Sequence, residues 1–252
     1  MPDDFLTNWL HPKPLPDLPT NITVLEECYE HRTAAERALA RTVRDHFVGI
    51  EIIKKMGGFT KAAIVVQNAL PMGKITRSGD FGEILATEYV EQCTSFSVPI
   101  RRLRYKDDRT VAMRGDDVLG FDFSTTPAGV LKTEAKSRVS LTSMVIEQAA
   151  AGLQRHKGRP NPSTLSFISR RLRESNCHKL AKAIEQLQEG DIPLDSVEHL
   201  IFTLSANDPT ALLAAHSDSP IKKIRRHLAG CVIKDHAQFI ASVFDGAGKA
   251  DK

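Results

Sequence analysis

Residues 117–136 read DVLGFDFSTTPAGVLKTEAK, and this stretch decides the fold. Its first and last seven residues are rich in apolar, β-branched and aromatic side chains. The six residues between them, 124–129, include Pro127 and Gly129. Pro and Gly favour turns, whereas β-branched and aromatic residues favour strands, so the stretch predicts a β-hairpin.

The register of this hairpin determines which side chains share a face. A six-residue loop places Asp117 opposite Lys136, and opposed residues project from the same side of the sheet. Glu134 joins them, because residues two apart on a strand share a face. Asp116 and Asp122 are then expected to point the other way. Any even loop length preserves this arrangement, whereas an odd one would substitute Asp116 for Asp117.

Two carboxylates and a lysine on one face suit metal-assisted hydrolysis of a phosphodiester. Carboxylate oxygens are ligands for Mg²⁺, which also takes water and phosphate oxygens. The metal lowers the pKa of a bound water, and a lysine can position that water or stabilise negative charge. The structural alternative is an ordinary ion pair of Lys136 with Glu134 or Asp117.

Further elements follow from hydrophobic spacing. Residues 33–49 predict a helix, and Ser78-Gly79-Asp80 predicts the N-cap of another over 81–90, with its apolar side chains at helical intervals. Residues 95–105 are β-like, although Pro99 favours an edge position. Helices are expected from Ser140 and over 167–188, whereas 221–244 is of unclear type. We expect a proline-rich extended arm over 1–20 and one domain over 21–252, with a core of about 75–160 and a helical or mixed part over 163–252.

The net charge of +3 conceals an uneven distribution. Lys and Arg minus Asp and Glu gives 10 − 13 = −3 for residues 1–95, 17 − 8 = +9 for 96–182 and 7 − 10 = −3 for 183–252. A local basic face suits a phosphate backbone, whereas solvated charges that pair within the chain are the alternative. The candidate nucleic-acid-binding residues are Arg101, Arg102, Arg104, Lys106, Arg155, Lys157, Arg159, Arg170, Arg171 and Arg173.

The acid at 117 followed by Glu134-Ala135-Lys136 resembles the core of the PD-(D/E)XK nucleases. That resemblance implies an α/β (α+β) fold with a central mixed β-sheet flanked by helices. It also implies an acid from a preceding helix, for which Glu83 is the match and Glu88 and Glu91 are substitutes. The resemblance therefore assigns catalysis to Asp117, Glu134, Lys136 and Glu83, with Mg²⁺ or Mn²⁺ held by the three acids. Many such nucleases carry Gln-x-x-x-Tyr on the next helix, but here the positions hold Gln148 and Gly152.

More narrowly, residues 77–85, 114–117 and 134–137 resemble the HamA family of the Hachiman antiphage defence system. That resemblance implies a DNA endonuclease that works with a helicase partner, HamB. Two alternatives stay open: a non-catalytic module that binds DNA or regulates a helicase, and a restriction or repair endonuclease. Gly57-Gly58 lacks the Lys-Ser/Thr of a phosphate loop, so we expect a partner to supply any ATP hydrolysis.

Other features exclude several classes of protein. No stretch approaches the ~18 to 20 apolar residues of a membrane span, and the first 15 residues lack a signal-peptide core. The four cysteines show no C-x-x-C spacing, which disfavours structural zinc and disulfides. We therefore expect a cytoplasmic protein with no membrane association.

Overall fold

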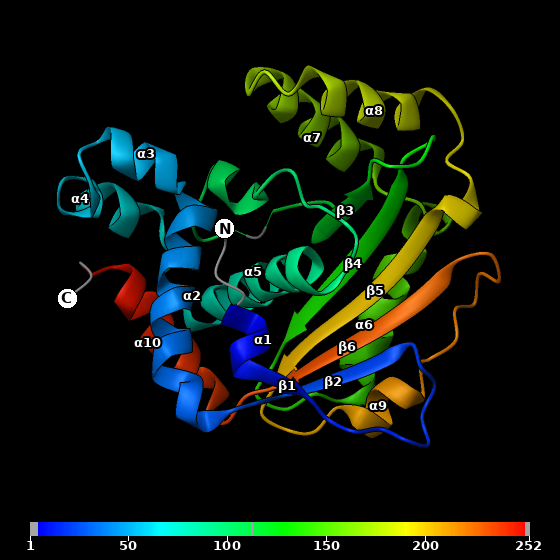
Figure 1. Cartoon of the computed structure of the whole chain (residues 1–252), viewed down its shortest axis with the longest axis horizontal. Coiled ribbons are helices and arrows are strands. Elements are labelled where there is room, and N and C mark those ends of the chain that lie inside the picture. Colours follow the sequence, from blue (N-terminus) through cyan, green and yellow to red (C-terminus); the bar gives the residue numbers. More distant parts are fainter. Residues whose placement is uncertain (1–4, 112, 250–252) are drawn as a thin grey trace.

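The computed structural model describes residues 5–111 and 113–249. Six strands of the described chain form one mixed sheet in the order β1-β2-β6-β5-β4-β3 (Figure 1). The inner strands β2, β6, β5 and β4 are parallel, whereas β1 and β3 pair antiparallel at the two edges. The strands are β1 Leu10–Pro12, β2 Ile22–Glu27, β3 Val118–Asp122, β4 Gly129–Ser137, β5 Val197–Ser205 and β6 Arg225–Val232.

Helices cover both faces of this sheet, which confirms the predicted α/β fold with a central mixed sheet (Figure 1). Successive side chains of β5 point to opposite faces of the sheet. Phe202 packs in the apolar cluster that includes side chains of α5, whereas Ile201 packs in the cluster that includes side chains of α6. None of the described helices is long and apolar enough to span a bilayer. The helices are α1 Phe5–Trp9, α2 Arg32–Phe47, α3 Ile50–Lys55, α4 Phe59–Ala69, α5 Lys74–Cys93, α6 Ser143–Gln154, α7 Pro162–Glu174, α8 His178–Glu189, α9 Thr210–Ala214 and α10 His236–Ala247.

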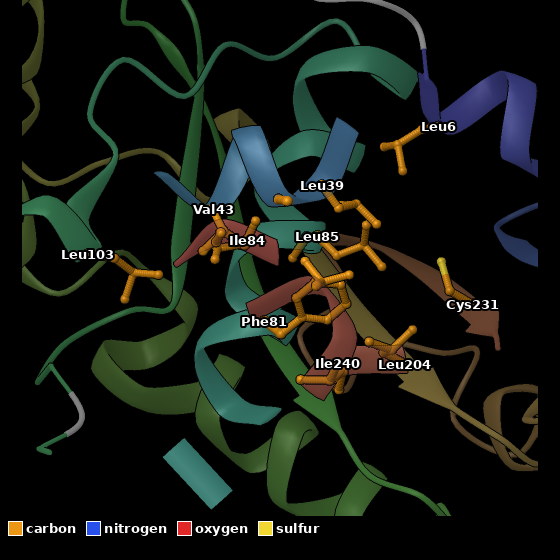
Figure 2. Close-up of a cluster of buried hydrophobic side chains, with 14 of the residues drawn as sticks. Leu6, Leu39, Val43, Phe81, Ile84, Leu85, Leu103, Leu204, Cys231 and Ile240 are labelled. Atoms are coloured by element: carbon orange, nitrogen blue, oxygen red, sulfur yellow. The ribbon is translucent and has the colours of Figure 1, made fainter. Parts of the chain in front are cut away.

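Helix α5 forms the centre of the larger core. Its side chains Phe81, Ile84 and Leu85 are fully buried, at the helical spacing that the sequence predicts. Figure 2 shows them against Leu39 of α2 and Ile240 of α10. Burying side chains of this size contributes roughly 1.5–3 kcal/mol each, so α5 is held rigidly against the sheet.

The predicted start of this helix is wrong. Helix α5 begins at Lys74 rather than after Asp80, and Gly73 precedes it. The polar residues that suggested a cap have tertiary partners instead: Ser78 Oγ lies 2.9 Å from Ser137 Oγ, and Asp80 accepts hydrogen bonds from Lys106. Tertiary contacts thus satisfy side chains that sequence reasoning assigned to a helix end.

Two other segments differ from expectation. Residues 95–105 contribute one isolated bridge, Ser97 to Phe121, and a 3₁₀ turn, rather than a strand. The expected helix over 167–188 is two helices, α7 and α8, which a turn separates at Asn176, where φ is +61°. Left-handed backbone cannot continue a helix, so the chain reverses there.

The amino-terminal segment is folded onto the body rather than extended. Residues 5–9 form α1, and 10–12 form the edge strand β1; residues 1–4 lie outside the described part. Trp9 is buried and stacks on Phe239 of α10 with ring centroids 5.1 Å apart. The proline spacing predicts an extended conformation and misses the helix over 5–9, whereas Trp9 itself indicates an anchor of this segment to the body or a partner. The segment of unclear type, 221–244, holds β6 and most of α10.

Candidate active site

The hairpin brings Asp117, Glu134 and Lys136 together at the carboxyl end of β4. Lys136 Nζ lies 2.9 Å from Glu134 Oε2 and 3.9 Å from Asp117 Oδ2. The main-chain N–H of Ala135 donates to Asp117 Oδ2 at 2.9 Å, which fixes that carboxylate beside the strand. Each group is therefore held by contacts within the hairpin itself.

The register differs from the predicted one by two residues. Phe121, not Phe123, pairs with Val130, so the loop is residues 123–128 and its length is still six. Continued by one residue, this register sets Asp117 opposite Glu134 rather than Lys136. A shift of two preserves the face of every side chain, which is why the convergence survives.

The electrostatics of this cluster disfavour two ionised carboxylates without a cation. Burial raises the pKa of Glu134, the negative charge of Asp117 raises it further, and Lys136 opposes both. Asp117 and Glu134 provide carboxylate oxygens, the donors that Mg²⁺ prefers, and Mg²⁺ commonly uses one or two carboxylates and completes its shell with water and phosphate. The donor set of this pair therefore fits the metal. Over residues 5–111 and 113–249, however, no three His, Cys, Asp or Glu side chains form a ready-made metal site.

Glu83, the expected third ligand, is held by a cation instead. Its Oε1 lies 3.1 Å from Arg102 Nε, and both side chains are almost completely buried. The pKa of Glu83 is raised to about 8, chiefly by burial and further by the charge of Asp117, with Arg102 opposing both. Glu83 is thus within electrostatic reach of Asp117.

The two substitutes for Glu83 are also engaged. Glu88 Oε1 lies 2.9 Å from His46 Nε2, and Glu91 accepts a hydrogen bond from the Val98 N–H. Both acids also pair with Arg101. These contacts hold α5 against α2 and against residues 98–101, so Glu88 and Glu91 have a structural role.

Asp116 does not point to the opposite side as expected, because it contacts Lys132, which shares the strand face of Glu134, in a cluster separate from Asp117. It is buried, accepts a hydrogen bond from the Asn161 N–H at 2.7 Å, and lies 3.5 Å from Lys132 Nζ. Lys132 is itself fully buried and donates to the carbonyls of residues 153, 155 and 159. Sequence reasoning missed this lysine, although its place two residues before Glu134 puts it on the same strand face.

Gly152 of α6 makes room for the Glu134 carboxylate. A Cβ at Gly152 would lie 2.5 Å from both Cδ and Oε1 of Glu134, closer than side-chain atoms approach. This is the position at which the resembling nucleases carry tyrosine. Gln148 lies one turn earlier on α6 and is exposed. The absence of the tyrosine thus has a steric reason here: the Glu134 carboxylate occupies the space that a side chain at position 152 would need.

The first basic cluster is committed to ion pairs within the chain. Lys106 is buried and lies 2.8 Å from Asp80 Oδ2, and Arg104 lies 3.2 Å from Asp45 Oδ1. Arg101 and Arg102 pair with acids of α5, as described above. This cluster therefore fastens residues 101–106 to α5 and α2.

The other two clusters leave three exposed cations. Arg155, Lys157 and Arg170 are exposed, and within the described chain their side chains have no ion-pair or hydrogen-bond partner. The remaining members are engaged: Arg159 donates to the Ile192 carbonyl, Arg171 pairs with Glu174, and Arg173 pairs with Glu185. His156 and Lys157 both adopt left-handed φ values, at +56° and +57°. The Arg155–Lys157 turn is thus the strained, positively charged end of α6.

Comparisons with known proteins assign the family. The chain is 30% identical over 182 residues to the Hachiman protein HamA of Bacillus cereus, which covers 71% of this chain and 64% of that relative. The chain thus spans less than two thirds of the length of the curated relative that it matches. A sequence model of the HamA family matches residues 3–247, nearly the whole chain. The protein therefore belongs to the HamA family.

Proposed function

We propose that this chain is a metal-dependent DNA endonuclease that acts in Hachiman antiphage defence. The observation that carries the proposal is the convergence of Asp117, Glu134 and Lys136 at one end of the hairpin, within 3.9 Å of one another through Lys136 Nζ. A Mg²⁺ or Mn²⁺ ion held by the two carboxylates would lower the pKa of an attacking water and offset charge on the phosphate. Lys136 would orient that water or stabilise the developing negative charge.

The surroundings support a role for Lys136 beyond a simple ion pair. Glu134 is almost fully buried, and Lys136 lies within 3.9 Å of both carboxylates. Surface ion pairs contribute little to stability, and a buried carboxylate costs several kcal/mol. A buried carboxylate at Glu134 beside the half-buried carboxylate of Asp117 suits a site that binds a cation. Family membership and the name of the Bacillus cereus relative support the role in defence.

The proposed partner is a helicase, HamB, that would supply unwinding and ATP hydrolysis. The chain lacks the phosphate loop for nucleotide hydrolysis, and four cations of its basic third, at 101, 102, 104 and 106, pair with acids outside that third. Those four cations are not available to phosphates, so a second subunit would strengthen the hold on DNA. Its residues outside 96–182 are mildly acidic and suit contact with another protein.

A non-catalytic, helicase-regulating module is the second candidate. It is favoured by the observation that no three potential ligands cluster in the described residues and that Lys136 already neutralises Glu134. Such a module would use the hairpin as structure alone. Cleavage assays separate the two functions.

Metal dependence is the direct test of the proposal. The isolated chain is expected to cut supercoiled and linear DNA with Mg²⁺ or Mn²⁺ and to lose that activity when EDTA removes the ion. Gel assays over a range of metal concentrations measure the effect. Absence of cleavage of DNA and RNA, both for the isolated chain and after release from its natural complex, would establish the non-catalytic module instead.

The salt dependence of DNA binding should identify the phosphate contacts. Replacing Arg155 and Lys157 by Ala is expected to reduce the slope of log affinity against log salt by about 2 on duplex DNA, because each phosphate contact contributes roughly 0.9. Fluorescence anisotropy at several salt concentrations measures the slope. The matched control is Arg104→Ala, which removes a cation already paired with Asp45. An equal change in slope for the control would disprove the assignment.

A further inference from the structure

A cavity of about 360 Å³ opens directly beside Asp117. It lies between the outer edge of β3, residues 98–102 and the first turns of α7. Its volume falls within the usual range of small-molecule sites, roughly 300–1,000 Å³. Of the cluster of Asp117, Glu134 and Lys136, Asp117 alone lines this space, so most of the cavity lies outside the proposed metal site.

The walls of the cavity suit a flat ring. Ile100, Leu119, Phe167 and Ile168 line it with apolar surface, and Phe167 adds an aromatic ring. An aromatic side chain can stabilise an unstacked nucleobase by stacking on its face. An alkyl chain would find the same walls, so the polar groups decide the class of ligand.

The outer edge of β3 supplies a main-chain donor and acceptor. Phe121 exchanges both of its hydrogen bonds with Ser97, so its N–H and C=O point away from β4. Antiparallel strands alternate this direction, and Leu119, two residues earlier, therefore presents its N–H and C=O on the same outer side. No described strand pairs with the edge at Leu119, which lines the cavity. Each DNA base carries an adjacent donor and acceptor on its pairing edge, which this residue can match.

Arg102 adds a buried cation with unused hydrogen-bonding capacity. Its side chain is 11% exposed and lines the cavity, and only its Nη2 makes a hydrogen bond within the described residues, to the Met113 carbonyl. Its Nε is buried beside Glu83 without hydrogen-bond geometry. A guanidinium that keeps free N–H groups in an apolar cavity favours a ring with polar edges over an alkyl chain.

We infer that this cavity holds one unpaired nucleoside, the neighbour of the phosphate at Asp117, during cleavage. The inference rests on the proposed function, because Asp117 forms part of the cavity wall and would also hold the metal at the phosphate. A base enters such a cavity only when it leaves the stack, which is unfavourable in duplex DNA and less so in a single strand. The chain should therefore prefer strands that are already unpaired, with little dependence on base identity.

Substitution at the rim of the cavity tests this inference. Ser163 lines the cavity and is exposed, and its hydrogen bond to Asn161 comes from the main chain, so its side chain can change without loss of the α7 cap. Ser163→Trp should fill the entrance, whereas Ser163→Ala leaves it open and is the matched control. The probes are deoxyadenosine 5′-monophosphate and deoxyribose 5-phosphate, titrated with Mg²⁺ and followed at the Met113 methyl by NMR.

The base should account for most of the affinity. We expect the nucleotide to bind the wild-type and Ser163→Ala chains at least 10-fold more tightly than the sugar phosphate, and Ser163→Trp to abolish the difference. Equal affinity for the two probes in the wild-type chain, or a difference that survives in Ser163→Trp, overturns the inference. Nucleotide binding can be measured without cleavage. If the base contributes to binding but no DNA is cut, the proposed endonuclease activity is refuted and the nucleoside cavity is retained. Cleavage that an abasic nucleotide leaves unchanged would refute only the nucleoside cavity.

Discussion

Replacing Glu134 by Gln is expected to lower DNA cleavage by at least about 10³-fold while the fold is retained. The substitution removes one of the two carboxylates that would hold the metal, and with it the charge that stabilises the reacting state. The free energy of unfolding should not fall. Burial disfavours the charged form of Glu134, as its raised pKa shows, and a neutral amide avoids the cost of burying that charge. Cleavage rates at saturating Mg²⁺ and urea unfolding measure the two quantities independently.

A carboxylate elsewhere on the same hairpin provides the control. Asp122 lies at the opposite end of β3, where its side chain accepts hydrogen bonds from Ser124. Asp122→Asn changes the same charge by the same amount and should leave cleavage unchanged. The double substitution Glu134→Ala with Lys136→Ala should be as inactive as Glu134→Gln, since both remove the Glu134 carboxylate that would hold the metal. Cleavage by Glu134→Gln at the wild-type rate would show that the hairpin is structural.

The sequence predicts which side chains share a face of the hairpin, because a register error of two residues leaves each side chain on the same face. The predicted and observed registers differ by two residues, yet Asp117, Glu134 and Lys136 still share one region. An error of one residue would have moved every side chain to the other face. Turn residues place the loop to within a residue or two, so the sequence predicts the grouping better than the exact pairing.

Ion pairing of the basic cluster was not predictable in the same way. Arg102, Arg104 and Lys106 find their acidic partners 19 to 59 residues earlier, at Glu83, Asp45 and Asp80. Charge summed along the chain cannot reveal pairs that form only when α2 and α5 pack together. The charge sum of residues 96–182 therefore does not distinguish these paired cations from the unpaired ones. The structure does, and it leaves Arg155 and Lys157 without ion-pair partners among the described residues.

Strand β6 was equally hidden, for a different reason. It is a buried parallel strand that begins with charged residues and contains Gly230, whose absent side chain makes room for Pro209. Strands buried on both faces lack the polar and apolar alternation that identifies a half-exposed strand. Periodicity therefore predicts the amphipathic helix α5 well and the central strand poorly.

Two glycines in helix interiors allow the geometry of the candidate site to be tested without changing any ionisable group. Gly152 on α6 faces the Glu134 carboxylate, whereas Gly79 on α5 has no neighbouring atom within 4 Å of the Cβ that alanine would add. Alanine stabilises a helix interior over glycine by about 1 kcal/mol. The same substitution therefore has the same local benefit at both positions and differs only in what the new methyl group meets.

Gly152→Ala is expected to reduce cleavage by about 10²-fold or more, because a displacement of about 1 Å at a reacting group has a cost of that size. The added Cβ would lie 2.5 Å from Glu134 Oε1, so the carboxylate must move away from Asp117 and Lys136. The free energy of unfolding should change little, since the end of a flexible side chain can shift while the helix gains propensity. Gly79→Ala should unfold at higher urea and cleave at the wild-type rate. If both variants cleave normally, the position of the Glu134 carboxylate against α6 has no part in the reaction.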